Sequence, residues 1–358
     1  MSSSAAPVRA AASSTAPSRA RHVTIAFCIL LALITYVDRV AIGQAAPFIS
    51  ADLGLSRIQM GWALAIFGYA YAIFEIPGGW MADRIGPRKV LMRIVLWWSF
   101  FTAATGWAWS ATSLVVARGL FGAGEAGAFP TMTRALTTWT PGKERERAQA
   151  FVWLATRVSA AFTPIFVLWL ITTLTWRRTF EILGVLGVVW ALFFYRWFRD
   201  DPAKHPSVNT GELAVLPSAS EAGIAHSGVP WGRVFSSPSV WLLSIQYMCL
   251  AYGWWFYINW LPSYLRDARG TSLQVGALLA GLPLLLGGVG CLVSAAMNTM
   301  GSIAGAFSVT IVGYLLAWTG DNWTMLFLIS ASIYLVGAVC WLFLDAHTPV
   351  AQGLEAGY

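Results

Sequence analysis

The sequence predicts an all-α membrane protein, a bundle of ten transmembrane helices that a polar linker divides into six and four. Composition is the first observation, because 57% of the 358 residues are hydrophobic and 11% are charged, whereas a soluble domain is about 25% charged. The second is that the apolar segments are long enough to cross a hydrocarbon core, which takes a helix of roughly 20 residues. The third is the abundance of Trp (20) and Tyr (11), which suits aromatic belts at two membrane interfaces.

Composition divides the chain into five parts. Residues 1–22 are rich in Ala and Ser and contain arginine but no acid, which predicts a disordered cytoplasmic tail, with an organellar transit peptide as the alternative. Residues 23–198 hold six apolar segments and residues 238–345 hold four. Residues 199–237 are polar and contain prolines and turn formers, which predicts a cytoplasmic linker. Residues 346–358 form a second cytoplasmic tail.

Polar turns bound each apolar segment. The first six lie at about 23–48, 58–81, 90–108, 113–137, 148–174 and 180–197, and the seventh at about 240–264. Residues 271–320 contain no charged residue and are too long for one span, so they predict two antiparallel helices with a turn near 290–298. A last span follows Asp321 and ends near residue 344.

Lysine and arginine gather in alternate loops. They follow the second, fourth and sixth segments, at Arg84, Arg88, Lys89 and Arg93, at Lys143, Arg145 and Arg147, and at Arg199, Lys204 and Arg233. By the positive-inside rule these loops are cytoplasmic. The sequence therefore predicts a multi-pass protein of the cell inner (plasma) membrane with both termini in the cytoplasm. These loops also explain the net charge of +7, so we expect no nucleic-acid partner.

Reactive chemistry has little support in the sequence. The four cysteines lie in apolar segments, without the spacing of a disulfide framework or a metal site. No nucleophile–base set, metal cluster or phosphate-binding loop occurs in the sequence. We therefore expect neither an enzyme nor a bound metal or cofactor. The four histidines lie outside the apolar segments, which argues against a histidine proton relay.

Charged residues inside the apolar segments carry the functional argument. Asp38 and Arg39 are adjacent in the first segment, and ionisable groups at that depth are costly unless they pair or face a wet cavity. In the fourth segment Arg118 and Glu125 are seven residues apart, which places them on one helix face about 10.5 Å apart. Nearby glycines let neighbouring helices approach closely, which can bring the first segment alongside. The result is a charge cluster able to take up and release a proton, or alternatively a static ion-pair lock.

The most specific motif is GWMADRIGPRK, which begins at Gly79 and follows the second segment. It resembles the loop signature between the second and third helices of the major facilitator superfamily, and it lies in the corresponding place. Gly79 and Gly86 suit close helix approach and a tight turn. The resemblance implies a gating role for Gly79, Asp83, Arg84, Gly86 and Arg88.

A narrower resemblance rests on TYVDRV, ARGLFGAGEAGAFP, DDPAKHPSVN and WLPSYL. These stretches resemble the anion:cation symporter family, which implies proton-coupled uptake of a small organic anion, a sugar acid or hexuronate foremost, by alternating access. The implied partners are that anion, protons and the lipid bilayer, and the implied state is a monomer. The implied proton-coupling residues are Asp38, Glu125 and Arg118. The implied substrate-binding residues are Arg39, Tyr36, Tyr71, Gln246 and Asn298.

The second bundle departs from the family pattern of six plus six helices. Its second helix resembles the family's eighth, and AAMNTMGSIAGAFSVTIVGYL resembles the eleventh. Helices nine and ten are therefore absent, which predicts a truncated four-helix bundle with the join near 294–295. A transport-deficient family member is the main alternative, and aromatic-acid uptake and drug efflux are others. The sequence leaves the roles of two more charged residues open. Arg157 either binds the anion or pairs with an acid such as Glu181. Glu75 suits a role in gating or in helix packing.

Overall fold

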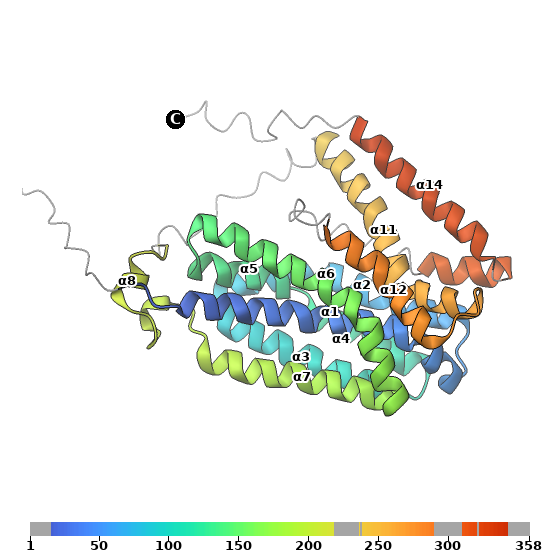
Figure 1. The fold of residues 1–358 in the computed structure, drawn as a ribbon, viewed down its shortest axis with the longest axis horizontal. Helices are drawn as coiled ribbons and strands as arrows, with labels where there is room; N and C mark the ends of the chain where they lie inside the picture. The colour runs from blue at the N-terminus through green and yellow to red at the C-terminus, as the bar shows by residue number, and fades with distance from the viewer. Residues whose placement is uncertain (1–15, 218–235, 237, 290–309, 321, 343–358) are drawn as a thin grey trace, which may run out of the picture.

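The computed structural model describes residues 16–217, 236, 238–289, 310–320 and 322–342. Within these ranges every regular element is a helix and no strand occurs, which confirms the predicted all-α class. The first part of the chain forms α1 (Ala20–Leu53), α2 (Arg57–Ile85), α3 (Pro87–Gly106), α4 (Ala111–Glu125), α5 (Ala128–Trp139), α6 (Gly142–Thr173) and α7 (Trp176–Trp197). Figure 1 shows them side by side in one bundle.

Local sequence signals set the helix ends of this bundle. Ser56 begins α2 with a capping box, in which its side chain accepts from the Gln59 amide and Gln59 bonds back. Gly54 ends α1 at φ 62, a left-handed conformation that suits glycine. Gly86 joins α2 to α3 at φ 93, and Pro87 occupies the first position of α3. The predicted tight turn at Gly86 is thus confirmed.

The predicted fourth span is not one helix. It breaks into α4 and α5 at Gly127, which has φ 87, a value that L side chains rarely adopt. A Cβ added at Gly78 of α2 would lie 2.7 Å from the Gly127 Cα atom, so two glycines touch at the break. Broken helices at membrane depth are tolerated where protein surrounds them, and α2 and α3 both pack on α5.

Helix packing corrects a second expectation. The main pairs in the bundle are α3 with α7, α1 with α6, and α2 with α4. The glycines of α4 face α2 and α3, since a Cβ at Gly122 would lie 2.4 Å from the Phe67 carbonyl oxygen and one at Gly124 would collide with Trp97. The prediction that these glycines bring the first segment alongside is therefore wrong. They bring α2 and α3 alongside.

The second part of the chain contains fewer described helices. These are α11 (Pro238–Asp267), α12 (Leu273–Val289), a helical segment Thr310–Thr319 and α14 (Trp323–Leu342). The turn predicted near 290–298 and the join near 294–295 lie outside the described residues. The short elements η1 (Pro202–Lys204) and α8 (Thr210–Leu213) fall in the predicted linker.

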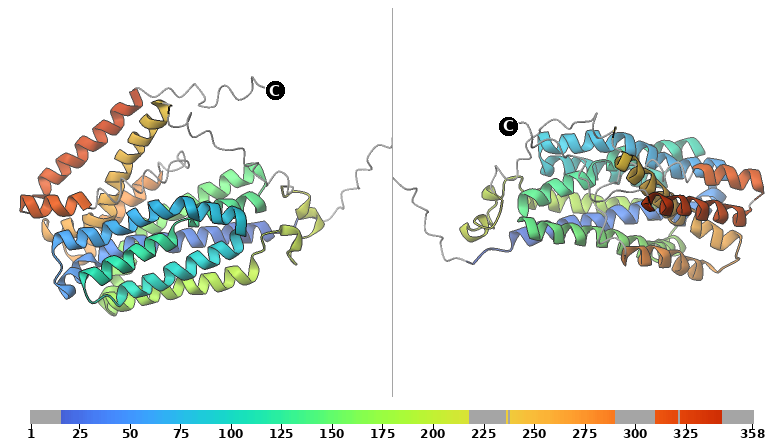
Figure 2. Two further views of the ribbon diagram at one scale, coloured as in Figure 1. Left: turned by 180° about the vertical axis from the view of Figure 1, so that it is seen from behind. Right: turned by 90° about the horizontal axis from the view of Figure 1, so that it is seen from above.

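The two parts meet along one end of the molecule. We define the basic end as the end that holds Gly86 and the segment 198–217. In Figures 1 and 2, α11 and α14 approach the bundle at the opposite end and lean away from it on the way towards the basic end. The contacts between the parts run from α11 to α1 and from α12 to α6.

Four of the described helices combine the length and the apolarity needed to cross a membrane. They are α1, α2, α7 and α6 from Glu144 onward. Three other described helices, α3, α11 and α14, reach spanning length with 20, 30 and 20 residues. The broken fourth span reaches that length only as the pair α4 and α5.

Candidate functional site

A buried ion pair joins α1 to α4 at the centre of the bundle. The Arg39 Nε donates to the Glu125 Oε1 at 2.5 Å, and both side chains are almost fully buried, with exposures of 7% and 0%. Removing two charges from water costs several kcal/mol per ion unless the geometry compensates. The second Glu125 oxygen and one Arg39 nitrogen have no hydrogen-bond partner among the described residues. The pair therefore holds unused hydrogen-bonding capacity.

Aromatic rings enclose the Arg39 guanidinium. Its central carbon lies 4.6 Å from the Tyr71 ring centroid, with Tyr36, Phe67 and Phe129 between 5.3 and 5.5 Å. Rings at such distances attract a cation through their π faces, by about 2 kcal/mol or more where the cation is desolvated. Tyr36 and Tyr71, which were both predicted to bind substrate, therefore line the site around Arg39.

The other two predicted charges lie beside this pair. Asp38 of α1 and Arg118 of α4 are both about 1% exposed, and Asp38 interacts electrostatically with Arg118 and Glu125. Neither Asp38 oxygen has a hydrogen-bond partner at ordinary distance among the described residues, although Thr102 lies nearby. Arg118 lies 4.4 Å from the Phe121 ring centroid. The structure therefore brings the four predicted charges into one buried cluster.

The break in the fourth span positions Glu125. This residue is the last of α4, and the Ala126 amide still donates to the Gly122 carbonyl oxygen. Because Gly127 then turns the chain, α5 starts in a new direction and Phe129 reaches the Arg39 site. The glycine signal at 122–127 was visible in the sequence, whereas its role in ending a helix was not.

Gln246, one of the two remaining predicted substrate residues, lies apart from this cluster. Gln246 is a half-buried residue of α11. Asn298 lies outside the described residues. Gln246 precedes Trp254 by eight residues, about 12 Å along an α-helix, and Trp255 rather than Gln246 touches the Arg39 site, through Phe67 at 5.6 Å.

The predicted gating residues make contacts within the first bundle. Asp83 lies 3.8 Å from Arg134 of α5, and Arg84 lies 4.4 Å from the Trp80 ring centroid. The Arg88 amide donates to Asp200, and its guanidinium donates to the Tyr195 carbonyl oxygen. Gly86 also faces Asp200, whereas Gly79 makes only ordinary contact with Pro130. At the basic end this motif ties α2 and α3 to α5 and to the end of α7.

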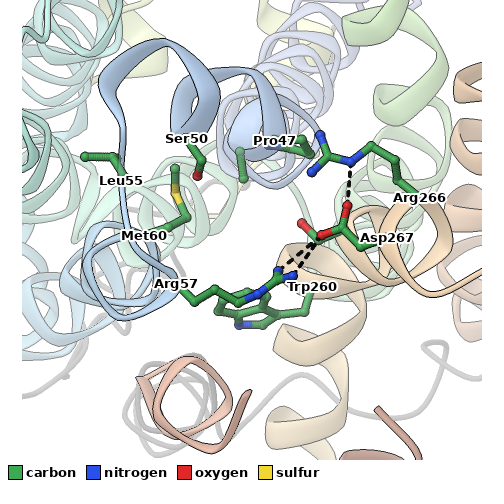
Figure 3. Close-up of a pocket in the computed structure, with 10 residues that line it drawn as sticks. Pro47, Ser50, Leu55, Arg57, Met60, Trp260, Arg266 and Asp267 are labelled. Carbon is green, nitrogen blue, oxygen red and sulfur yellow. Dashed lines mark hydrogen bonds and ion pairs between the residues drawn. The ribbon is translucent and has the colours of Figure 1, made fainter. Parts of the chain in front are cut away.

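A small pocket lies at the opposite end, between the two parts of the chain. It has a volume of about 180 Å³ and is lined by α1, α2 and α11. Figure 3 shows Arg57 and Arg266 both directed at the Asp267 carboxylate, with the Arg57–Asp267 pair at 3.2 Å and the Arg266–Asp267 pair at 2.7 Å. Sequence reasoning missed the Arg57–Asp267 contact, since its partners are 210 residues apart.

Packing also holds the two parts together at this end. A Cβ on Gly43 of α1 would lie 2.3 Å from the Ile258 carbonyl oxygen, so the backbones of α1 and α11 are in close contact. Trp62 and Tyr69 of α2 hydrogen-bond Tyr314 and Thr310 of the segment Thr310–Thr319. The structure is therefore closed at the end opposite the basic end.

The comparison with known proteins agrees with this architecture. Residues 28–297 match the sequence profile described as Major Facilitator Superfamily. The chain belongs to this superfamily. It is a multi-pass membrane protein, and the predicted superfamily is confirmed.

Curated relatives carry transporter names. The chain is 40% identical over 274 residues to the "Probable sulfoacetate transporter SauU" of Cupriavidus necator, covering 76% of this chain and 63% of that protein. It is 28% identical over 362 residues to the "Probable L-galactonate transporter" of Escherichia coli, covering 96% of this chain and 79% of that protein. The chain thus spans less than two thirds of the first of these relatives, which is consistent with the predicted absence of two helices.

Solved structures show the same fold. A bacterial homologue of the human lysosomal transporter Spinster superposes with a TM-score of 0.62 at 19% identity, over 90% of this chain and 80% of that chain. A D-xylose–proton symporter superposes with a TM-score of 0.62 at 14% identity, over 92% and 98%. The fold of the chain is that of the superfamily, and the residues that the structure describes contain fewer spans than the usual 12.

Proposed function

We propose that the chain is a secondary active transporter that couples uptake of a small organic anion to protons. The observation that carries this proposal is the buried Arg39–Glu125 pair inside an aromatic cage. Arginine stays protonated, and its planar fork suits a carboxylate. A carboxylate inside the membrane is functional by default, whether as a proton carrier or as a substrate contact.

Competition for Arg39 supplies the coupling step. When Glu125 is ionised, its carboxylate pairs with the Arg39 guanidinium, as in the structure. Protonation removes the negative charge of Glu125, so Arg39 is released to bind the carboxylate of an incoming anion. Asp38 and Arg118 lie beside the pair and add one negative and one positive charge to the cluster. Proton and anion then bind together, although they bind at different residues.

Alternating access moves the bound pair across the membrane. In the proposed division, residues 23–198 and 238–345 rock against each other about the central site. The structure corresponds to the state closed at the end where Arg57 meets Asp267. The arginine and lysine content of the basic end supports a cytoplasmic orientation for it. We propose the same side for both termini and the inner (plasma) membrane for the chain.

Relatives narrow the substrate class. Sugar acids and hexuronates are the proposed substrates, because Tyr36 and Tyr71 beside Arg39 suit hydroxylated ligands and the name of one relative specifies galactonate. The name of the relative at 40% identity specifies sulfoacetate, which adds short sulfonated acids to the candidates. Aromatic acids and drug efflux rank lower, since Arg39 and Arg118 in the site favour anions and hydroxyl partners favour sugars.

Uptake into proteoliposomes tests the proposal. Purified protein is reconstituted, and radiolabelled galactonate, glucuronate and sulfoacetate are offered with and without an inward-directed proton gradient. We expect saturable accumulation of at least one acid, driven by the gradient and abolished by a protonophore. Accumulation to the same level with and without the proton gradient would contradict proton coupling.

A transport-deficient family member is the second candidate, and the short second part of the chain favours it. This chain spans 63% of its sulfoacetate-transporter relative, and in the family helix ten helps to line the pathway. Such a protein would fold and bind an acid but move none across the bilayer. Binding of acid to the detergent-purified protein without any uptake or counterflow in proteoliposomes would establish this alternative.

A further inference from the structure

Arg157 of α6 is a cation with an aromatic partner from the other part of the chain. Its guanidinium carbon lies 3.9 Å from the centroid of the Trp254 ring of α11. Its buried Nε has no hydrogen-bond partner among the described residues. Glu181 is not its partner, since that carboxylate bonds Arg178 at 2.5 Å and Trp107 at 3.0 Å. Arg157 therefore carries a positive charge that no described carboxylate matches.

Two aromatic walls connect Arg157 with the Arg39 site. One wall runs through α5 and α6, because Phe129 lies 5.5 Å from Arg39 and stacks on Trp153 at 5.1 Å. Trp153 precedes Arg157 by four residues, about 6 Å along the axis of α6. Phe129 and Trp153 therefore form an aromatic surface that runs from Arg39 to within about one helical turn of Arg157.

The other wall runs through α2 and α11. Phe67 lies 5.3 Å from the Arg39 guanidinium and 5.6 Å from the Trp255 ring. Trp255 is the neighbour of Trp254, which covers Arg157. Adjacent residues of α11 therefore contact Arg157 directly and the Arg39 site through Phe67.

Charge and geometry show what such a position can bind. Asp38 and Glu125 interact with Arg39 and Arg118, so the described acids of the cluster are already engaged. A ring stacked on one face of a guanidinium leaves its in-plane N–H groups free for a planar oxyanion. Arg157 is half-buried, so its terminal N–H groups remain accessible for such a contact. An anionic group in the plane of Arg157 would complete the site.

We propose that Arg157 binds the second acidic group of a dianionic substrate, while Arg39 binds the first. The transporter would then select acids with an anionic group at each end, dicarboxylates or carboxylates bearing a sulfonate, over acids with one. This inference deepens the proposed function and rests on it. Arg157 acts as a specificity residue, with Trp254 holding its guanidinium in place.

The test compares two acids with one carbon skeleton. Binding of D-glucarate, with a carboxylate at each end, and D-gluconate, with one, is measured by calorimetry on the full chain in lipid nanodiscs. We expect the wild type to bind glucarate at least about tenfold more tightly, which corresponds to about 1.4 kcal/mol. Arg157→Gln should remove that preference and leave the affinity for gluconate within about twofold, whereas Arg157→Lys should retain part of it.

Arg178→Gln serves as the matched control, because Arg178 pairs with Glu181 on the exposed surface of α7. It should change the affinity for neither acid. Equal loss of both acids in Arg157→Gln, or no loss of either, would overturn the assignment of Arg157 while leaving the transporter proposal intact. A wild type that binds none of glucarate, gluconate, galactonate, glucuronate and sulfoacetate would overturn both proposals. Size-exclusion profiles identify any variant that fails to fold.

Discussion

The two parts of the chain differ in where they carry charge. The buried charges of the first seven helices lie on α1, α2 and α4, at Asp38, Arg39, Glu75, Arg118 and Glu125, and α6 adds the half-buried Arg157. The described helices of the second part carry no charged residue except Arg266 and Asp267, at the end of α11. The first part can therefore hold the proton and the anion by charge. The second part can contribute rings, amides and a closing contact.

This difference separates two tasks that a transporter must couple. A charge cluster buried in one rigid bundle keeps its geometry whether the access path is open or closed. A neutral partner helix can move past it without breaking an ion pair at depth. In this view Trp254 and Trp255 of α11 cover the charges in one state. The contact that changes during transport then lies elsewhere, at the end where α11 meets α2.

Glu125→Gln makes the sharpest test of the charged part, and its effect should be the largest. The amide cannot carry a proton, so proton-driven uptake should fall to the level of protein-free liposomes. Exchange of internal for external substrate should survive, because Arg39 is left free for the anion. Uptake and counterflow measured on the same proteoliposomes check both expectations. Glu181→Gln, at a carboxylate that pairs with Arg178 instead, should retain gradient-driven uptake.

Loss of expression or folding in Glu125→Gln would point to a static lock between α1 and α4. Breaking a buried ion pair from one side costs about 3–5 kcal/mol because it leaves the other charge unpaired. A double variant, Arg39→Met with Glu125→Leu, separates the two explanations. It should fold and fail to transport if the pair is functional, and recover stability if the pair is a lock.

The fold was predictable from the sequence to the level of individual helices in the first part. Apolar segments, polar turns and the glycine at 86 correspond to α1, α2, α3, α6 and α7. The charge cluster was also predictable, because intramembrane charges must find partners and Asp38, Arg39, Arg118 and Glu125 were the available set. Both predictions rest on strong physical penalties, which leave a sequence few alternatives.

Features that depend on which helices become neighbours were not predictable. The glycines at 122 and 124 indicate a close approach, yet nothing local says that the partners are α2 and α3 rather than α1. The rings of Phe67 and Phe129 around Arg39 could not be predicted either. The sequence is 14% aromatic, and the spacing of these two residues does not distinguish them from other aromatic residues. The helix break at Gly127 depends on its contact with Gly78, which only the packed structure contains.

Gly78→Ala tests the rigidity on which the comparison depends. A Cβ at this position would lie 2.7 Å from the Gly127 Cα atom and 2.9 Å from the Ala126 carbonyl oxygen, and both are backbone atoms that cannot rotate away. Overpacking of this kind costs about 1–3 kcal/mol. We expect the unfolding midpoint in detergent to fall by several degrees. Gly142→Ala is the control, since nothing lies within 4 Å of its added Cβ, and its midpoint should not fall.

Asp267→Asn tests the contact between the two parts. The Arg57–Asp267 pair is 30% and 21% exposed, and such pairs contribute up to about 1 kcal/mol. Its loss should shift the balance away from the closed state by at most about fivefold. A cysteine placed at Ser50 in the pocket reports this by faster labelling from the outside with a membrane-impermeant reagent. Asp201→Asn, at an exposed pair with Lys204 near the basic end, should leave the labelling rate unchanged.

Glu212 tests whether the segment between the two parts is anchored to the first. Its buried carboxylate accepts from the Ser18 hydroxyl, from the Arg21 amide at 3.0 Å and from the Arg21 guanidinium at 3.3 Å. Burial alone would raise the pKa of Glu212, but these hydrogen bonds outweigh it and lower the pKa below its ordinary value. A lowered pKa stabilises the folded state above the unfolded-state pKa of about 4.3, and that stabilisation is lost as the pH falls through the folded-state pKa.

Glu212→Gln should therefore lower the unfolding midpoint by a few degrees at pH 7 and by less at pH 4, because below the unfolded-state pKa the unfolded chain binds the proton and the stabilisation declines. Thermal unfolding of both proteins across that pH range measures the difference. A midpoint difference that stays constant with pH would mean that shape, and not charge, accounts for the effect of Glu212. No difference at any pH would mean that α8 and the start of α1 are joined too weakly to matter. In that case the described residues would hold the second part of the chain to the first through contacts of α11, α12, α14 and the segment Thr310–Thr319 with α1, α2 and α6.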